Sequence, residues 1–160
     1  KELLEYHKVR LVIQTRSPLA TRDIDLFKQF DVIQVNLTVT TDSEAVRKAF
    51  EPHCPSNKMR LKAIKEITEA GVQTCITMTP LLPVESAKDF TEQLLETGVK
   101  KFIVQPFHQD KGKFIAGTGA SALEQVNKMN WNDTKYEEVV KVFRKELPWL
   151  GEGKCGFAPI

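Results

Sequence analysis

The chain alternates strand-like and helix-like segments, and this alternation is the feature that most restricts its fold. Short apolar stretches rich in Val, Ile and Thr are separated by longer stretches with apolar residues at helical spacing. Parallel strands joined through helices pair with right-handed crossovers. We therefore predict an α/β domain with about four parallel strands and flanking helices. The predicted strands are 9–15, 31–41, 72–80 and 100–107.

Capping residues and a glycine mark the ends of several predicted helices. Thr21 and Ser56 are candidate N-caps, and Thr134 with Glu137 forms a candidate capping box. Gly71 stands where the third of these helices should stop. Because no linker interrupts the pattern, we predict a single domain over residues 1–160. The predicted helices are 21–30, 43–50, 56–71, 85–98, 119–129 and 132–147.

Two architectures fit this order of elements: an open doubly wound sheet, or part of a (β/α) barrel. No GxGxxG follows a predicted strand, which disfavours a dinucleotide-binding sheet. Both architectures bind ligands at the carboxyl ends of their strands. In this chain those ends read QTRSP, NLTVTT, MTPLLP and QPFHQ.

Bulk composition excludes several classes of protein and favours none strongly. The formal net charge is +2, so charge alone gives no support for DNA binding. The longest apolar runs have strand length, so no membrane span is predicted. Cys54, Cys75 and Cys155 are far apart, which argues against a disulfide framework or a zinc ribbon and favours a cytoplasmic location. The three histidines are scattered and form no metal-ligand spacing.

The second predicted strand carries a polar face. Gln34, Asn36 and Thr38 alternate with apolar residues, so period two places all three on one side. A parallel strand covered by helices should be apolar on both faces. The polar side therefore indicates either an interior that holds a ligand, as a barrel lumen can, or an edge strand with one face in water.

Two arginines stand near the predicted ligand-binding end. Arg60 lies in the first turn of the helix 56–71 and on its apolar stripe, so its guanidinium should point inward. That position suits a carboxylate or phosphate ligand. The alternatives are that Arg60 reaches solvent or pairs with Glu51. Arg16 follows the first strand at the same end. The predicted stripe consists of Met59, Ala63, Ile64, Ile67 and Ala70.

Three stretches together resemble one enzyme family. They read IQTRSPLATRDIDLF, VNLTVTTDSEAVRKAFEPHCPSNKMRLKAIKEITEAGV and TPLLP. They are similar to the radical S-adenosylmethionine (radical SAM) enzymes of the spore photoproduct lyase-like group, also described as DNA repair photolyase-like. The likeness covers residues 5–107 well and the last third loosely. It implies a partial (β/α) barrel, a 4Fe–4S cluster held by a CxxxCxxC motif, and hydrogen abstraction by a 5′-deoxyadenosyl radical.

The resemblance assigns roles to individual positions. Thr38 matches a hydroxyl residue near the ribose of S-adenosylmethionine, and Arg16 matches a cation near its methionyl carboxylate. Arg60 is assigned to the same carboxylate or to an ion pair with Glu51.

Three further positions follow from the strand ends. Met78 and Thr79 would flank the adenine of the cofactor. Gln105 would face the substrate from the last predicted strand.

The CxxxCxxC motif itself is absent from the sequence. The resemblance therefore predicts the second half of a radical SAM barrel, catalytic only within a longer chain and binding no cofactor tightly alone. The alternative is a non-catalytic half-barrel that self-associates through exposed strand edges. DNA stays open as a partner, and a barrel for phosphorylated sugars fits QPFHQDKG poorly.

Overall fold

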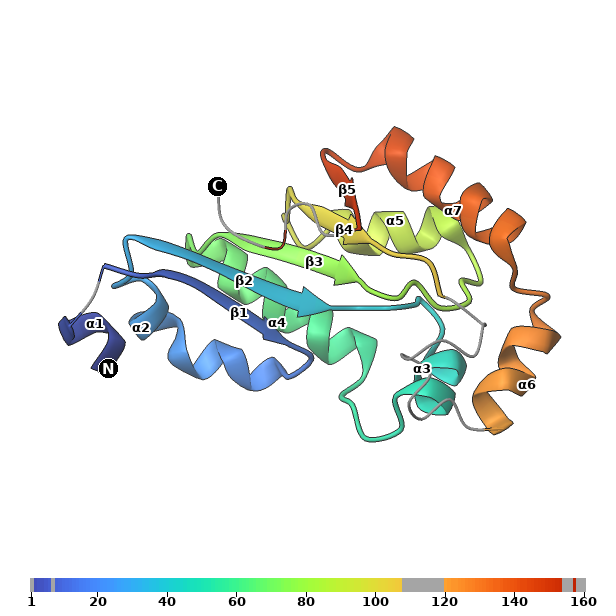
Figure 1. Cartoon of the computed structure of the whole chain (residues 1–160), viewed down its shortest axis with the longest axis horizontal. Helices are drawn as coiled ribbons and strands as arrows, with labels where there is room; N and C mark the ends of the chain where they lie inside the picture. The colour runs from blue at the N-terminus through green and yellow to red at the C-terminus, as the bar shows by residue number, and fades with distance from the viewer. Residues whose placement is uncertain (1, 7, 108–119, 154–156, 158–160) are drawn as a thin grey trace.

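The structure is a computed structural model that describes residues 2–6, 8–107, 120–153 and 157. Its centre is a parallel sheet in the order β1-β2-β3-β4-β5, so each strand lies beside its neighbours in sequence (Figure 1). A doubly wound sheet would reverse its strand order part-way. The predicted α/β partial barrel is therefore confirmed. The strands are β1 (Arg10–Thr15), β2 (Val32–Thr38), β3 (Thr74–Met78), β4 (Phe102–Val104) and β5 (Leu150–Glu152).

Strand β5 was not predicted from the sequence. It has three residues, and it follows directly on Pro148 and Trp149 at the end of a helix. So short a segment carries no recognisable alternation of apolar and polar residues. The structure identifies it through its pairing with β4, in which Ile103 lies opposite Gly151.

Helices connect successive strands and cover one face of the sheet (Figure 1). Helix α4 contacts both β2 and β3, and α5 packs against α7, where the rings of Phe90 and Phe143 meet edge to face at 5.8 Å. The helical elements are α1 (Glu2–Tyr6), the 3-10 helix η1 (Pro18–Asp23), α2 (Ile24–Phe27), α3 (Glu44–Phe50), α4 (Asn57–Glu69), α5 (Ala87–Leu95), α6 (Ala120–Lys128) and α7 (Asp133–Glu146).

The hydrophobic core lies between the helices and the sheet face that they cover. Leu37, Ile76 and Phe102 point to this side from adjacent strands, together with Ile64 of α4. A smaller cluster around Phe27 packs near the start of β2. Because burial of apolar area is the main favourable term in folding, this face holds the domain together.

The opposite face, which we call the inner face, carries Gln34, Asn36 and Thr38 of β2. Their exposed fractions are 0, 0 and 1%. Strand β2 pairs with β1 on one side and β3 on the other, so the edge-strand interpretation of its polar residues is wrong. The polar residues belong to a covered interior, as the barrel interpretation predicts.

Polar side chains cap several helix N-termini, but some of the capping residues differ from those predicted. Ser56 caps α4 as expected, and its hydroxyl accepts from the backbone N–H of Met59 at 3.3 Å. The prediction for Thr21 is wrong: the helical segment after β1 starts earlier, as η1, with Ser17 as cap and Pro18 at the first position. Met59 was assigned to the buried stripe of α4 but is 53% exposed.

The capping box predicted at Thr134 and Glu137 is also wrong. Asn132 caps α7 and accepts from the backbone N–H of Lys135 at 3.0 Å. Trp131 precedes this cap and Tyr136 occupies the first full turn, and both are buried in the main core. This spacing is that of a hydrophobic staple, a signal that could have located the helix start.

We expect Asn132→Ala to lower the free energy of unfolding by about 1 kcal/mol, because the N–H of Lys135 loses its acceptor. The matched control is Thr134→Ala on the same exposed turn, expected to change it by less than ~0.5 kcal/mol. Urea denaturation followed by circular dichroism measures both. A larger loss for the Thr134 variant would contradict the assignment of the cap.

Candidate functional site

The loops that follow β2 and β3 are joined at the carboxyl end of the sheet. The hydroxyl of Thr41 donates to the carbonyl of Pro83 at 2.6 Å. The carboxylate of Asp42 accepts from the backbone N–H groups of Glu85 and Ser86, each at 2.9 Å. Burial raises the pKa of Asp42, although these two donors favour its charged form. The carboxyl ends of β2 and β3 therefore form one linked unit.

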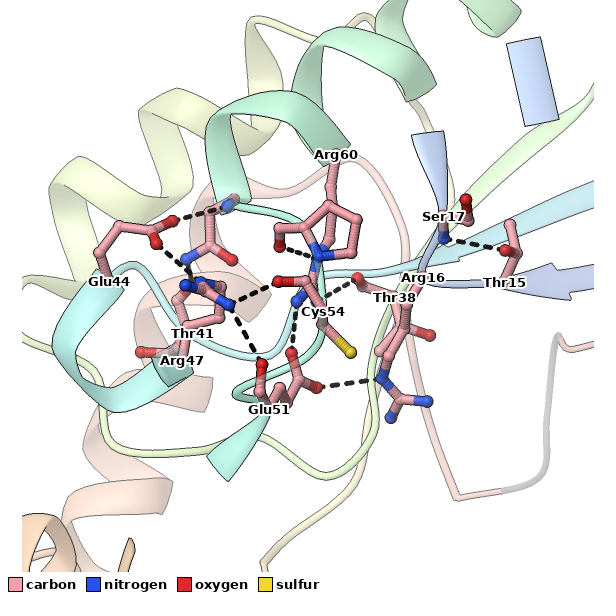
Figure 2. A network of polar contacts seen from close by, with 12 residues as sticks. Thr15, Arg16, Ser17, Thr38, Thr41, Glu44, Arg47, Glu51, Cys54 and Arg60 are labelled. Carbon is pink, nitrogen blue, oxygen red and sulfur yellow. Dashed lines mark hydrogen bonds and ion pairs between the residues drawn. The ribbon is translucent and has the colours of Figure 1, made fainter. Parts of the chain in front are cut away.

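Glu51 lies between two arginines at this end (Figure 2). Its Oε2 atom accepts from Nη2 of Arg60 at 2.6 Å, and its Oε1 atom accepts from Nε of Arg16 at 3.0 Å. The side chains of Glu51 and Arg60 are 10% and 0% exposed, whereas that of Arg16 is 44% exposed. One carboxylate thus joins a buried arginine to an accessible one.

Arg60 also binds the backbone on both sides of Glu51. Its Nε donates to the carbonyl of Pro55 at 2.9 Å, and its Nη1 donates to the carbonyl of Thr38 at 3.1 Å. The guanidinium therefore ties the turn before α4 to the last residue of β2. A buried charge is tolerated only when it is paired and hydrogen-bonded, and Arg60 meets both conditions.

Sequence reasoning missed a second buried arginine, Arg47, which is 5% exposed. Its Nη1 donates to the carbonyls of Glu51 and Cys54 at 3.1 and 2.6 Å, and its Nε donates to Glu44 at 2.7 Å. The other oxygen of Glu44 accepts from the N–H of Asn57 at 2.6 Å. The spacing of Glu44 and Arg47 on one helix was the available signal. This pair shapes the turn that presents Glu51.

The threonines at the strand ends meet on the inner face. The hydroxyls of Thr38 and Thr77 lie 2.8 Å apart and are buried. Thr79 follows β3 directly and is half-buried. Arg16, Thr38 and Arg60 are thus brought to one end of the sheet, with Thr79 just beyond the adjacent strand. Their assignment to a cofactor stays a prediction.

Met78 and Gln105 lie in different surroundings. The side chain of Met78 is fully buried in the core beneath the helices, on the face opposite Thr38. Its predicted contact with adenine therefore needs correction, because a side chain on the helix side cannot line the inner face. Gln105 is half-buried, and its Nε2 donates to the carbonyl of Gly153 at 2.8 Å.

The described residues contain no cluster of three or more His, Cys, Asp or Glu side chains that could hold a metal ion. Cys54 is half-buried in the turn beside Arg47, and Cys75 is buried on β3. Cys155, His7 and His108 lie outside the residues that the structure describes. Within the described ranges, no helix is long and apolar enough to cross a lipid bilayer.

Comparison with models of protein families shows which family the chain belongs to. The family model of the radical SAM superfamily matches residues 1–95, which is more than half of the 160 residues. The chain belongs to the radical SAM superfamily. The match spans β1, β2 and β3 with their connecting helices, and so includes Glu51 and both of its arginine partners.

Two curated relatives of this radical SAM chain match over different lengths. Protein MJ0683 of Methanocaldococcus jannaschii is 38% identical over 76 residues, which is 48% of this chain and 29% of the relative. Protein ORF301 of Acidianus two-tailed virus is 26% identical over 145 residues, covering 87% of this chain and 48% of the relative. The chain therefore spans half or less of the length of these relatives.

Solved structures show the same fold at low sequence identity. Streptococcus suis SuiB bound to S-adenosylmethionine aligns with a TM-score of 0.59 and 15% identity, over 97% of this chain and 34% of SuiB. A spore photoproduct lyase variant aligns with a TM-score of 0.58 and 12% identity, over 94% of this chain and 54% of the lyase. At such identities the likeness concerns the fold.

We expect Glu51→Gln to lower the free energy of unfolding by about 3–5 kcal/mol, because it leaves the buried guanidinium of Arg60 without its carboxylate. The matched control is Arg16→Gln, which removes the exposed partner and should cost less than ~1 kcal/mol. Urea denaturation at neutral pH compares the two variants. Equal losses of unfolding free energy in the two variants would contradict the conclusion that the buried Arg60 depends on Glu51 more than the exposed Arg16 does.

We expect the Cys75 thiol to resist alkylation in the native protein at pH 8. Burial raises the pKa of this thiol to about 12, so its reactive thiolate is scarce. Mass spectrometry after iodoacetamide treatment, in a Cys155→Ser background, should show label on Cys75 only after denaturation. Rapid native labelling of Cys75 would show that β3 is more accessible than its burial indicates.

Proposed function

We propose that this chain forms the second half of the S-adenosylmethionine-binding barrel of a radical SAM enzyme and is inactive alone. The observation that carries the proposal is the family match over residues 1–95, which includes the carboxyl ends of β1, β2 and β3. Parallel α/β folds bind their ligands at these ends. The polar inner face is consistent with a ligand there, since buried polar side chains need partners.

Arg16 is the residue we assign to the methionyl carboxylate. The Nε of Arg16 donates to Glu51, and the two terminal nitrogens of the Arg16 guanidinium point away from Glu51 (Figure 2). A guanidinium edge of this kind can donate two parallel hydrogen bonds to a carboxylate. Arg16, Arg60 and Glu51 together keep one positive charge, which an anionic ligand would neutralise.

Thr38 and Thr79 are assigned to the ribose and the adenine of the cofactor. Thr38 offers a hydroxyl at the end of β2, where it already exchanges a hydrogen bond with Thr77. Arg60 acts indirectly in this proposal. It fixes Glu51, and Glu51 in turn fixes the Nε of Arg16. Gln105 keeps its proposed place toward the substrate, directly after β4, the strand that pairs with β3.

The iron–sulfur cluster does not fit the residues described here, because no set of thiolates gathers among them. When both groups are bound in the enzyme, they supply its radical chemistry. The part of this chain is to bind and orient the cofactor and to shield it from water. A lesion in DNA, the substrate of spore photoproduct lyase itself, is one candidate substrate, and it rests on the sequence resemblance alone because the net charge of +2 gives no separate support for DNA.

The gene product that contains this chain, with whatever sequence precedes Lys1, tests the proposal. Purified without oxygen and reconstituted with iron and sulfide, it should show iron–sulfur absorbance and cleave S-adenosylmethionine to 5′-deoxyadenosine after reduction. The 160-residue chain alone should do neither. A gene product that lacks CxxxCxxC and takes up no cluster would refute the proposal.

For that gene product we expect Arg16→Gln to raise the Kd for S-adenosylmethionine about tenfold or more, because a charge-assisted pair of hydrogen bonds is lost. The matched control is Arg22→Gln, an exposed arginine of the neighbouring helical turn that pairs with Asp23. It should leave the Kd unchanged. Calorimetry measures both Kd values. Equal changes in Kd for the two variants would show that Arg16 does not bind the cofactor.

Self-association through β1 is a second candidate role. Among the described residues β1 pairs on one side only, and Val12 on its inner side is 37% exposed. An unpaired strand edge can pair with another chain. Light scattering decides between the roles for the isolated chain: a monomer mass at high concentration would exclude self-association.

A further inference from the structure

Three threonines lie close together at the end of β2, and their hydroxyls differ in what they bind. The hydroxyl of Thr38 lies 2.8 Å from the hydroxyl of Thr77. The hydroxyl of Thr41 donates to the carbonyl of Pro83 at 2.6 Å. The hydroxyl of Thr40 is buried and has no hydrogen-bond partner among the described residues. Thr40 is therefore the exception among the three.

The backbone around Thr40 is held on both sides. The N–H of Val39 donates to the carbonyl of Thr77 at 3.1 Å, which continues the pairing of β2 with β3 by one residue. The carbonyl of Thr40 accepts from the N–H of Leu82 at 2.9 Å. Thr40 is 1% exposed, so its hydroxyl has lost contact with water without gaining a protein partner. Such a group destabilises the folded protein, because its desolvation is not compensated.

Alternation along the chain places Thr40 on the inner face. Leu37 and Val39 pack in the main core on the helix side. Because neighbouring residues of an extended chain point to opposite faces, Thr38 and Thr40 share the inner face. Thr40 lies about 7 Å beyond Thr38 in the direction of the carboxyl end of the sheet. Its hydroxyl therefore faces the end of the inner face at which the cofactor is proposed to bind.

Two other buried side-chain atoms lack a partner among the described residues, and neither faces this end of the inner face. They are Oδ1 of Asn57 and the hydroxyl of Tyr136. Tyr136 lies in the main core beneath the helices. Asn57 lies at the start of α4 and lines a groove beside Leu61 on the helix side. Of the three atoms, the hydroxyl of Thr40 is the one that a ligand on the inner face could satisfy.

We propose that Thr40 is a ligand-binding residue whose hydroxyl bonds to a hydroxyl or ring nitrogen in the nucleoside part of the bound cofactor. The inference rests on the proposed function, because it places Thr40 at the same site. A threonine hydroxyl is neutral and can both donate and accept, which suits a nucleoside, whereas the methionyl carboxylate is assigned to Arg16. Without ligand the protein carries an unsatisfied hydroxyl, and the ligand satisfies it. Stability and affinity should therefore respond to Thr40 in opposite directions.

The first arm of the experiment measures stability without ligand, in the gene product that contains this chain. Thr40→Val keeps the shape of the side chain and removes the hydroxyl, so it should not lower the urea midpoint of unfolding. The matched control Thr41→Val should lower the midpoint, because the carbonyl of Pro83 loses its donor. If Thr40→Val lowers the midpoint as much as Thr41→Val does, the Thr40 hydroxyl has a partner in the protein and the inference is overturned.

The second arm measures binding by calorimetry. The probes are S-adenosylmethionine and 5′-deoxyadenosine, which has the nucleoside but lacks the methionyl part. Thr40→Val should raise the Kd of both about five- to tenfold, because one hydrogen bond to the ligand is lost. The control Thr91→Val should change neither Kd, since the buried hydroxyl of Thr91 donates to the carbonyl of Ala87 within α5. Unchanged Kd values for Thr40→Val, or a rise for S-adenosylmethionine alone, would overturn the inference.

The two arms separate failure of this inference from failure of the proposed function. If the unmodified protein binds both probes and Thr40→Val binds them equally well, the proposed function stands and the role of Thr40 is refuted. If no form of the protein binds either probe, the ligand assignment of Thr40 falls with the proposed function. The urea midpoints still decide in that case whether its hydroxyl is unsatisfied. Circular dichroism verifies that each variant is folded before the Kd values are compared.

Discussion

The carboxyl end of the sheet depends on one buried charge and the carboxylate that neutralises it. Arg60 is fully buried, and its guanidinium binds Glu51, the carbonyl of Pro55 and the carbonyl of Thr38. These three contacts link a helix, a turn and a strand that no apolar contact could link so specifically, because hydrogen bonds are directional. Once Arg60 is in place, the positions of Glu51 and therefore of the Nε of Arg16 follow.

The two faces of the sheet have different physical roles. The helix side is apolar, continuous and buried, and it contains Leu37, Ile76 and Met78. The inner face is polar and equally buried along β2, so its stability requires that each amide and hydroxyl has a partner. In this chain the partners come from the same face, as for Thr38 and Thr77, and from the end of the chain.

Much of this arrangement could be predicted because the responsible signals are local. Alternation of apolar and polar residues identified four strands. The polar side of β2 left two interpretations open, an interior or an edge strand, and the pairing of β2 on both sides decides for the interior. The stripe on α4 placed Arg60 inward, and the structure shows the pairing with Glu51 that was one of two alternatives. Met78 and Thr79 were both placed beside the adenine because they stand at one strand end, but neighbouring strand residues point to opposite faces, and the Met78 side chain lies in the core.

Other features depend on contacts between residues that are distant in sequence. Strand β5 exists because Gly151 lies beside Ile103, and three residues carry too little pattern to predict that. The contact of Phe157 with Asn36 joins positions 121 residues apart. The predicted caps Thr21 and Thr134 were wrong for another reason. Serine, threonine and asparagine all cap helices well, so neighbouring candidates cannot be ranked without the backbone geometry.

The charge count at the carboxyl end explains why a shared carboxylate suits an anion-binding site. Arg47 is neutralised locally by Glu44, whereas Glu51 serves two arginines at once. If Glu51 were absent, Arg60 would be a buried unpaired charge, and the turn would not hold. If a second carboxylate paired with Arg16, the guanidinium edge would be occupied and the cluster of Arg16, Arg60 and Glu51 would keep no positive charge. One carboxylate between a buried and an accessible arginine stabilises the first and orients the second. It also leaves the single positive charge with which an anionic group could pair.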